Sequence, residues 1–235
     1  MDRDSRISVC MATYNGEKYL KAQLDSILLQ LSVNDEIIIS DDGSLDATLE
    51  IIASYKDSRI KVLHNQSHHG VVPNFENAIK YASGDYIFLC DQDDVWHLDK
   101  VRICVKALQK IDLVVHNSLI MDENGLISDR DYFSLRHPRN GYWRNLYRNS
   151  FMGSCMAFRK ELLSYVLPFP KHILWHDMWI GLMAAKKAKI LFIPDCLLYY
   201  RRHGDNTSAT SQKSTFPIWK MICYRWWMLY YTLQR

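Results

Sequence analysis

The first half of the chain alternates between short apolar runs and longer segments whose apolar residues recur at helical spacing. Buried strands are predicted for residues 7–12, 36–40, 59–64 and 86–90. Helices are predicted after each of them, at about 17–31, 46–55, 73–82 and 101–108. This alternation predicts an α/β fold with a mostly parallel sheet and right-handed crossovers, in which ligands bind beyond the carboxyl ends of the strands.

Polar side chains follow three of these strands, at the point where each strand ends. They are Thr13 and Asn15, then Asp41 and Asp42, then Asp91 and Asp93. Because the carboxyl ends of parallel strands meet at one edge of a sheet, we expect these side chains to line one crevice. Neither GxGxxG nor GxxxxGK[ST] follows the first strand, which argues against a dinucleotide-binding oxidoreductase and a P-loop NTPase.

The third cluster belongs to the stretch 84–96, GDYIFLCDQDDVW, which combines a buried strand with three carboxylates, Asp91, Asp93 and Asp94. Several negative charges at one strand end are costly unless a cation or a polar ligand lies beside them. Oxygen ligands of this kind suit Mg²⁺ or Mn²⁺, and Mg²⁺ usually shares its shell with substrate phosphates. The alternative is a solvated acidic turn that caps the next helix.

Composition narrows the class of protein. A chain of 235 residues with 48% hydrophobic residues predicts one globular domain, or one domain with an appendage. The net charge of +3 arises from nearly balanced charges, which argues against nucleic-acid binding as the main activity. Six cysteines stand singly, and the charged start lacks a signal-peptide pattern, so we expect reduced thiols in a cytoplasmic protein.

The second half is less regular. Strands are predicted at 112–121, 151–159, 189–193 and 196–202, helices at 160–166 and 180–188, and a loop with some helix at 129–148. Asp177, in the motif WHDMW, lies near the start of the helix at 180–188. From its position alone, the interpretation is that it caps this helix.

The tail, residues 217–235, predicts an amphipathic helix. One broad face carries Ile218, Trp219, Ile222, Trp226, Leu229, Tyr230 and Leu233, and the other carries Lys220, Arg225, Thr232 and Arg235, interrupted by Met221 and Met228. The segment is too short and too charged to span a bilayer. Its mixture of Trp, Tyr, Lys and Arg favours a helix lying on a membrane surface, and the alternative is a helix packed on the domain or into a homodimer.

With these motifs in view, the sequence resembles the family 2 glycosyltransferases of the GT-A fold over about residues 7–206. The matching stretches are ISVCMATYNGEKYL, EIIISDDGSLDAT, GDYIFLCDQDDVW, WHDMW and YYRRHGDN. The resemblance implies a Rossmann-like, mostly parallel central sheet flanked by helices. It implies a glycosyltransferase domain at 1–206, with a nucleotide-binding half at 1–111 and an acceptor-binding half at 112–206. A linker and the amphipathic helix follow at 207–235.

The resemblance also implies roles for residues at matching positions. Nucleotide contacts fall on Thr13, Tyr14, Asn15, Asp41, Asp42, Asn74 and Asp91. Metal ligands, in the family's DxD-type motif and beyond it, fall on Asp91, Asp93 and His203, with Asp94 as a substitute. Asp177 matches the catalytic base, and acceptor contacts fall on Trp175, His176 and Trp179. The family more often has Glu-Asp where this chain has His176-Asp177, so the acceptor contacts stay open.

These roles imply an inverting transfer, dependent on Mn²⁺ or Mg²⁺, from dTDP-rhamnose or a UDP-sugar to a lipid-linked saccharide. Within the family the sequence looks most like bacterial enzymes that build O-antigen, capsule or rhamnan, many of them rhamnosyltransferases. Such an enzyme would be cytoplasmic and peripheral on the inner face of the plasma membrane. Two alternatives stay open: a nucleotidyltransferase that makes nucleotide sugars, although the Gly-rich basic loop it needs after the first strand is missing, and a non-catalytic membrane-associated scaffold subunit.

Overall fold

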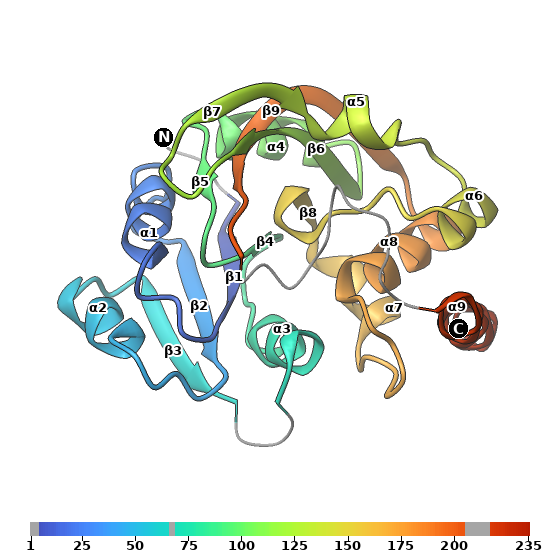
Figure 1. Ribbon diagram of the computed structural model, residues 1–235, viewed down its shortest axis with the longest axis horizontal. Helices are drawn as coiled ribbons and strands as arrows, with labels where there is room; N and C mark the ends of the chain where they lie inside the picture. The colour runs from blue at the N-terminus through green and yellow to red at the C-terminus, as the bar shows by residue number, and fades with distance from the viewer. Residues whose placement is uncertain (1–4, 66–68, 205–216) are drawn as a thin grey trace.

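The computed structural model describes residues 5–65, 69–204 and 217–235, and Figure 1 shows its curved sheet with helices packed against it. In the described residues the sheet has nine strands in the order β3-β2-β1-β4-β8-β6-β9-β5, with β7 paired to β6. The strands are β1 (Ile7–Thr13), β2 (Glu36–Asp41), β3 (Ile60–His64), β4 (Tyr86–Cys90), β5 (Val95–Trp96), β6 (Leu113–Met121), β7 (Ile127–Asp131), β8 (Met156–Arg159) and β9 (Ile190–Arg201). The helices are α1 (Leu20–Leu28), α2 (Thr48–Ser54), α3 (Val71–Lys80), α4 (Lys100–Leu108), α5 (Tyr132–Arg136), α6 (Tyr142–Tyr147), α7 (Leu163–Val166), α8 (His176–Lys187) and α9 (Ile218–Leu233), with 3₁₀ turns η1 (Gly153–Cys155) and η2 (Lys160–Leu162).

Strands β3, β2, β1 and β4 run parallel, as the alternation predicts. Thr13 lies opposite Asp41, and Met11 lies opposite Cys90, so β1, β2 and β4 end at the same edge of the sheet. Nearly every residue of these three strands is buried, as expected for a parallel sheet covered on both faces. The predicted α/β fold with flanking helices is confirmed, and it brings the three polar strand ends together.

Close packing of helices and strands stabilises the parallel half of the sheet. Helix α3 covers β1 and β2 with Phe75, Ala78 and Ile79, which share one helix face and are fully buried. Burying a side chain such as Phe or Ile contributes roughly 1.5–3 kcal/mol. Gly84, just before β4, permits close pairing with β1, because a Cβ there would lie 2.7 Å from backbone atoms of Ile7 and Ser8.

The second half of the sheet mixes strand directions. β8 pairs antiparallel with both β4 and β6, and β6 pairs parallel with β9. The two strands predicted at 189–193 and 196–202 form one strand, β9, with Pro194 inside it. Proline cannot donate to the ladder, and the pairing of β9 with β6 changes register at this point. The segment 129–148 contains the end of β7 together with α5 and α6.

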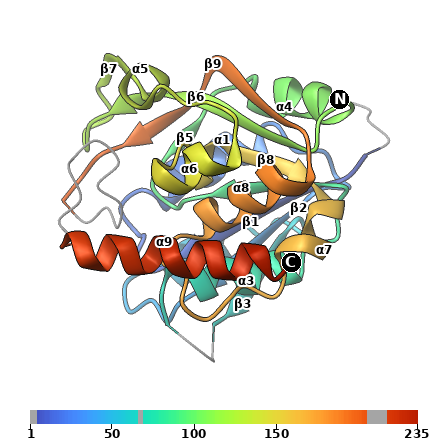
Figure 2. The ribbon, with the colours of Figure 1, turned by 90° about the vertical axis from the view of Figure 1, so that its right-hand side faces the viewer.

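Helix α9 lies across one side of the molecule, and Figure 2 looks onto this side. Its polar face contacts the body of the protein: Arg225 donates to the carbonyl oxygen of Tyr147, and Lys186 donates to the carbonyl oxygen of Thr232. Met228 is buried on the attached side and Leu229 packs partly against the core, whereas Ile218, Trp219, Ile222 and Trp226 are more than half exposed. None of the helices in the described residues has the length and apolar character needed to cross a bilayer. The predicted linker, residues 207–216, lies outside the described residues.

Candidate active site

The loop after β1 is held by a carboxylate at the end of β2. The hydroxyl of Thr13 donates to Oδ1 of Asp41 at 2.9 Å, and Oδ2 of Asp41 accepts from the backbone N–H groups of Gly43 and Ser44. Both carboxylate oxygens of this buried residue are therefore engaged within the protein. Asp41 shapes the turn and fixes Thr13, so its contribution to a ligand site is positional.

Asp42 connects the end of β2 to the loop before α3. It accepts from the side chain of Asn65 at 2.8 Å and from the backbone N–H of Gly70 at 2.7 Å, and His69 lies 3.1 Å away. Asn74, in the first turns of α3, donates to the carbonyl oxygen of Thr13 at 3.1 Å. Its Oδ1 is buried and has no partner. A buried acceptor without a partner is costly, so Oδ1 of Asn74 marks a position where a ligand donor fits.

Asn15 and Tyr14 form the tip of the β1 loop. Asn15 has a positive φ of 47°, which asparagine tolerates better than most residues, and its Oδ1 accepts from the backbone N–H of Leu45 at 2.9 Å. The side chain of Gln92 makes a two-point contact with Tyr14, accepting from its N–H and donating to its carbonyl oxygen, each at 3.0 Å. Sequence reasoning missed Gln92, because a glutamine between two aspartates gives no periodic signal.

The acidic motif follows β4, and its members differ in environment. Oδ2 of Asp93 lies 2.8 Å from Nε2 of His203, so the structure brings these two predicted metal ligands together across 110 residues. Asp91 is half-buried, and burial together with the charges of Asp93 and Asp177 raises its pKa to about 7. The strand end therefore concentrates negative charge that a cation or phosphate-bound metal would relieve.

Asp94 is fully buried. Its Oδ1 accepts from the backbone N–H of Arg201 at 2.9 Å, and its Oδ2 has no partner. Burial raises the pKa of this carboxyl well above its ordinary value, and the charges of Asp93 and Asp91 add to the shift. Asp94 thus attaches β9 to the acidic motif. Because its carboxylate is engaged in this contact, Asp93 is better suited than Asp94 to ligate a metal.

Lys100 supplies a buried positive charge beside this cluster. The side chain is fully buried, its Nζ donates to the carbonyl oxygen of Ser154 at 2.7 Å, and it lies 4.1 Å from the centre of the Trp96 ring. Its charge opposes the upward pKa shifts of Asp91 and Asp94. Sequence reasoning missed Lys100, although its spacing from Cys104 and Leu108 already put it on the buried face of α4.

Asp177 lies in the first turn of α8, as its position in the sequence predicts. Burial raises its pKa to about 6, although backbone N–H groups at the helix start oppose the shift. A carboxylate with a pKa near the working pH is suited to accept a proton from a hydroxyl group. Asp177 also contributes to the raised pKa of Asp91, so the helix start and the acidic motif share one electrostatic environment.

His176 is enclosed between α3 and the turn η1. Its ring stacks on Phe75 at a centroid distance of 3.9 Å, and its Nε2 is buried without a partner. Burial lowers its pKa to about 3, so the ring is neutral at neutral pH. Gly153 approaches it so closely that a Cβ at this glycine would lie 2.7 Å from Nε2 of His176. The ring is therefore enclosed by Phe75 and Gly153, and the contact of His176 with an acceptor stays a prediction.

Trp175 and Trp179, both predicted to contact the acceptor, differ in their burial. Trp175 is half-buried beside Tyr224 of α9, with a ring distance of 5.9 Å. Trp179 is fully buried, and its indole N–H donates to the carbonyl oxygen of Val166 at 2.9 Å. The side chain of Trp179 therefore packs in the core, and its contact with an acceptor stays a prediction.

A divalent cation at this site would need oxygen or nitrogen ligands from the protein. Among the described residues, no three or more His, Cys, Asp or Glu side chains form a group that could hold a metal ion. Asp93 and His203 do lie in contact, and oxygen and imidazole donors suit Mn²⁺. A metal that takes the rest of its shell from phosphate oxygens and water needs few protein ligands, so these residues fit such a cation.

A separate depression lies away from these residues. A cavity of 420 Å³ lies at the amino ends of the parallel strands, lined by Arg6, Asp35, Glu36 and Lys61 among others. Its charges pair with one another, since Arg6 and Lys61 both contact Glu36. The depression lies at the opposite edge of the sheet from the polar strand ends, so it is separate from the candidate site.

The profile of Glycosyl transferase family 2 matches residues 8–167. The chain is 28% identical over 222 residues to UDP-Glc:alpha-D-GlcNAc-diphosphoundecaprenol beta-1,3-glucosyltransferase WfgD of Escherichia coli. That alignment covers 93% of this chain and 86% of the relative.

Solved structures share the fold. A crystal structure of residues 1–349 of S. aureus TarS in complex with UDP-GlcNAc superposes with a TM-score of 0.74 at 20% identity, covering 95% of this chain and 66% of that one. Mannosyltransferase PcManGT from Pyrobaculum calidifontis, in complex with GDP-Man and Mn²⁺, superposes with a TM-score of 0.63 at 20% identity, covering 84% of this chain. This chain spans 57% of the PcManGT chain.

Proposed function

The chain belongs to glycosyl transferase family 2, and on this basis we propose that it transfers a sugar from a nucleotide diphosphate to a hydroxyl group of a lipid-linked saccharide. The observation that carries the proposal is the pairing of Asp177, whose pKa is near 6, with the acidic end of β4 in one electrostatic environment. One carboxylate is suited to accept a proton, and the neighbouring group is suited to bind a cation with a diphosphate.

In the proposed reaction Asp177 accepts the proton of the acceptor hydroxyl. The hydroxyl oxygen forms a bond to the anomeric carbon while the bond from this carbon to the diphosphate oxygen breaks, and the electron pair leaves with the nucleoside diphosphate. A single base with in-line displacement inverts the configuration at the anomeric carbon. Product NMR that shows retention would contradict this step.

Asp93 and His203, with Asp91, would hold a divalent cation, Mn²⁺ or Mg²⁺. When bound, such a cation supplies positive charge at the leaving diphosphate. Lys100 moderates the repulsion among the carboxylates, and Asp94 fixes the end of β9 near His203. The chain's own contribution is therefore to hold the acidic motif in place before the donor arrives.

For the nucleotide we propose contacts with Thr13, Tyr14, Asn15, Asp41, Asp42, Asn74 and Asp91. The free Oδ1 of Asn74 supports a direct contact, whereas the saturated Asp41 supports an indirect one. Residues 1–111 would form the nucleotide-binding half and 112–206 the acceptor-binding half. His176 and Trp175 would face the acceptor.

The relatives favour a UDP-sugar over dTDP-rhamnose as the donor. The name of WfgD specifies UDP-Glc and a GlcNAc-diphosphoundecaprenol acceptor, and TarS was crystallised with UDP-GlcNAc. By this analogy the acceptor is a saccharide on a lipid diphosphate at the inner face of the plasma membrane. The outward apolar face of α9 supports peripheral attachment to that membrane.

Calorimetric binding of UDP, dTDP and GDP, each with and without Mn²⁺, tests the donor site. We expect metal-dependent binding of UDP that is lost in Asp93→Asn and kept in Asp129→Asn, a matched change at an exposed carboxylate. Preference for dTDP would instead favour rhamnose. If a folded protein binds none of the three, the non-catalytic scaffold becomes the better explanation.

A further inference from the structure

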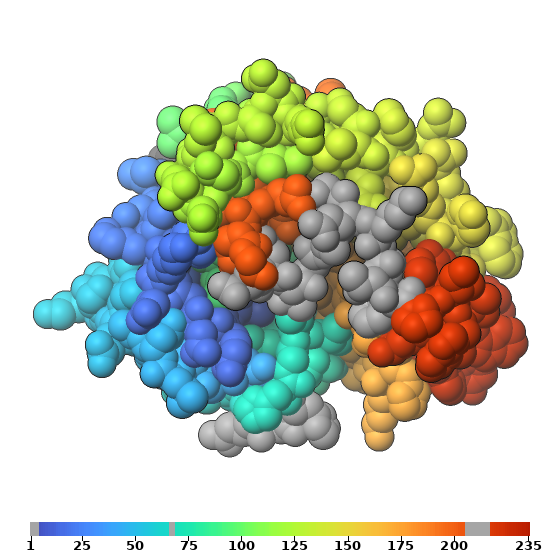
Figure 3. All heavy atoms as spheres, viewed as in Figure 1, coloured from blue at the N-terminus to red at the C-terminus, as the bar shows by residue number. Residues whose placement is uncertain are grey.

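Helix α6 lies beside α9 on the same side of the molecule, and its aromatic residues are also exposed. Trp143 is 68% exposed and Tyr147 is 79% exposed, and their spacing of four residues puts them on one face of α6. The two helices are joined by the contact of Arg225 with the carbonyl oxygen of Tyr147, and by a hydrogen bond between the hydroxyls of Tyr142 and Thr232. Figure 2 shows α6 and α9 on the side that faces the viewer, and Figure 3 shows the same segments next to each other at the right-hand edge.

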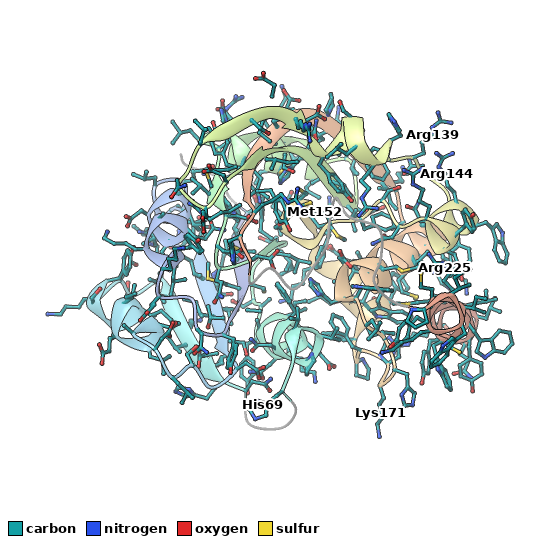
Figure 4. All side chains as sticks on the ribbon, viewed as in Figure 1. His69, Arg139, Arg144, Met152, Lys171 and Arg225 are labelled. Atoms are coloured by element: carbon teal, nitrogen blue, oxygen red, sulfur yellow. The ribbon has the colours of Figure 1, made fainter. Side chains whose placement is uncertain are left out.

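The charge of this side differs from that of the rest of the chain. Segments 137–149 and 217–235 contain six lysines and arginines and no aspartate or glutamate: Arg139, Arg144, Arg148, Lys220, Arg225 and Arg235. Because the whole chain has a net charge of +3, the remaining residues have a net charge of −3. Figure 4 shows Arg139, Arg144 and Arg225 on the side where α9 lies. Positive charge and exposed aromatic residues therefore occur together.

We propose that α6 and α9 form one docking surface for a bilayer containing anionic lipids, with Trp143, Tyr147, Trp219 and Trp226 in the interface and Arg139, Arg144 and Arg148 against the head groups. The inference rests on the proposed membrane attachment of α9 and extends it to a second helix and a lipid class. Trp and Tyr favour the membrane–water interface, and clustered cations attract anionic head groups.

A second copy of the chain fits this surface less well. In a two-fold symmetric dimer the same patch meets itself, so the cationic segments of the two copies would face each other without any acidic partner. Like charges brought together across an interface oppose association. An anionic bilayer satisfies both the apolar and the cationic part of the surface.

Co-sedimentation with phosphatidylcholine vesicles, with and without phosphatidylglycerol, tests the proposal on the full chain. We expect tighter binding to the anionic vesicles, weakening as salt rises. The triple variant Arg139→Gln/Arg144→Gln/Arg148→Gln should bind these vesicles on the order of 100-fold more weakly. The matched variant Lys21→Gln/Lys106→Gln/Lys110→Gln changes the net charge equally at exposed positions outside the surface and should bind like the wild type.

Trp143→Ser/Tyr147→Ser tests the aromatic part of α6, and Trp219→Ser/Trp226→Ser tests α9. Both should weaken binding to vesicles of either composition while the melting temperature and UDP binding stay unchanged. Equal binding of the arginine variant and its lysine control, or equal binding of wild type to neutral and anionic vesicles, overturns the proposal. So does a dimer in sedimentation that dissociates on Trp219→Ser/Trp226→Ser. Vesicle binding without nucleotide binding would refute the proposed function alone, and the reverse result would refute only the docking surface.

Discussion

Replacing Asp177 by asparagine should make the protein inactive and more stable at the same time. Burial raises the pKa of this carboxyl from its ordinary 3.8 to about 6, so the folded state resists its ionisation. At neutral pH the group is nevertheless charged, and the difference between the two pKa values corresponds to about 3 kcal/mol of lost stability. Asp177 is only partly covered, so solvent screening reduces this figure, and the net gain on substitution is about 1–3 kcal/mol.

The sign of the pH dependence follows from the direction of this shift. Between pH 4 and 6 the folded state binds more protons than the unfolded state, so the wild type loses stability as the pH rises through this range. Asp177→Asn lacks this loss. The variant should be more stable at pH 8, and the difference should disappear as the pH falls toward 4.

Thermal unfolding followed by circular dichroism at pH 5, 6, 7 and 8 measures the effect, at about 2–4 °C for each kcal/mol in a domain of this size. The activity of Asp177→Asn should fall about 100- to 10,000-fold, and kcat/KM of the wild type should fall tenfold per pH unit below about 6. Asp129→Asn, at an exposed site, should change stability by less than about 0.5 kcal/mol. A variant that is less stable at pH 8, or a difference that does not vary with pH, would refute the reasoning.

Three further changes test the supporting structure. Lys100→Met should destabilise the fold by about 1–3 kcal/mol in urea unfolding, because it leaves the buried carbonyl oxygen of Ser154 without its donor; unchanged stability would show that this hydrogen bond contributes nothing. Gly84→Ala should cost about 1–3 kcal/mol, because its Cβ meets backbone atoms of β1, and unchanged stability would mean that the strands separate easily. His203→Gln should weaken Mn²⁺-dependent UDP binding about 10- to 100-fold in calorimetry and leave metal-free UDP binding unchanged. An equal loss of binding with and without Mn²⁺ would instead assign His203 to the nucleotide.

The parallel half of the fold was predictable because its strands are buried on both faces and its helices carry regular apolar faces. Strand β4 and helix α4 begin and end within one residue of their predicted limits. The polar strand ends were predicted to meet, since parallel register alone brings them to one edge. The contact between Asp93 and His203 joins residues that follow β4 and β9, a pairing that local periodicity does not reveal.

Other features depend on tertiary contacts that no local pattern shows. The strand β9 continues through Pro194 because β6 pairs with it on both sides of the interruption. The inward direction of Trp179 depends on which face of α8 meets the core, and WHDMW alone gives too few residues to define that face. A helical wheel of residues 217–235 separates an apolar face from a polar face, but it does not show which face packs on the protein. The contacts of Arg225 with Tyr147 and of Lys186 with Thr232 show that the polar face is attached.

One turn of α3 makes two contacts that connect separate parts of the candidate site. Asn74 binds the carbonyl oxygen of Thr13, and its neighbour Phe75 stacks on His176, next to Asp177. The spacing between the first-strand loop and the start of α8 is thereby defined by adjacent residues of one helix. Any displacement of α3 would therefore move the β1 loop and the start of α8 together, so the proposed nucleotide contacts and the proposed base would keep their separation.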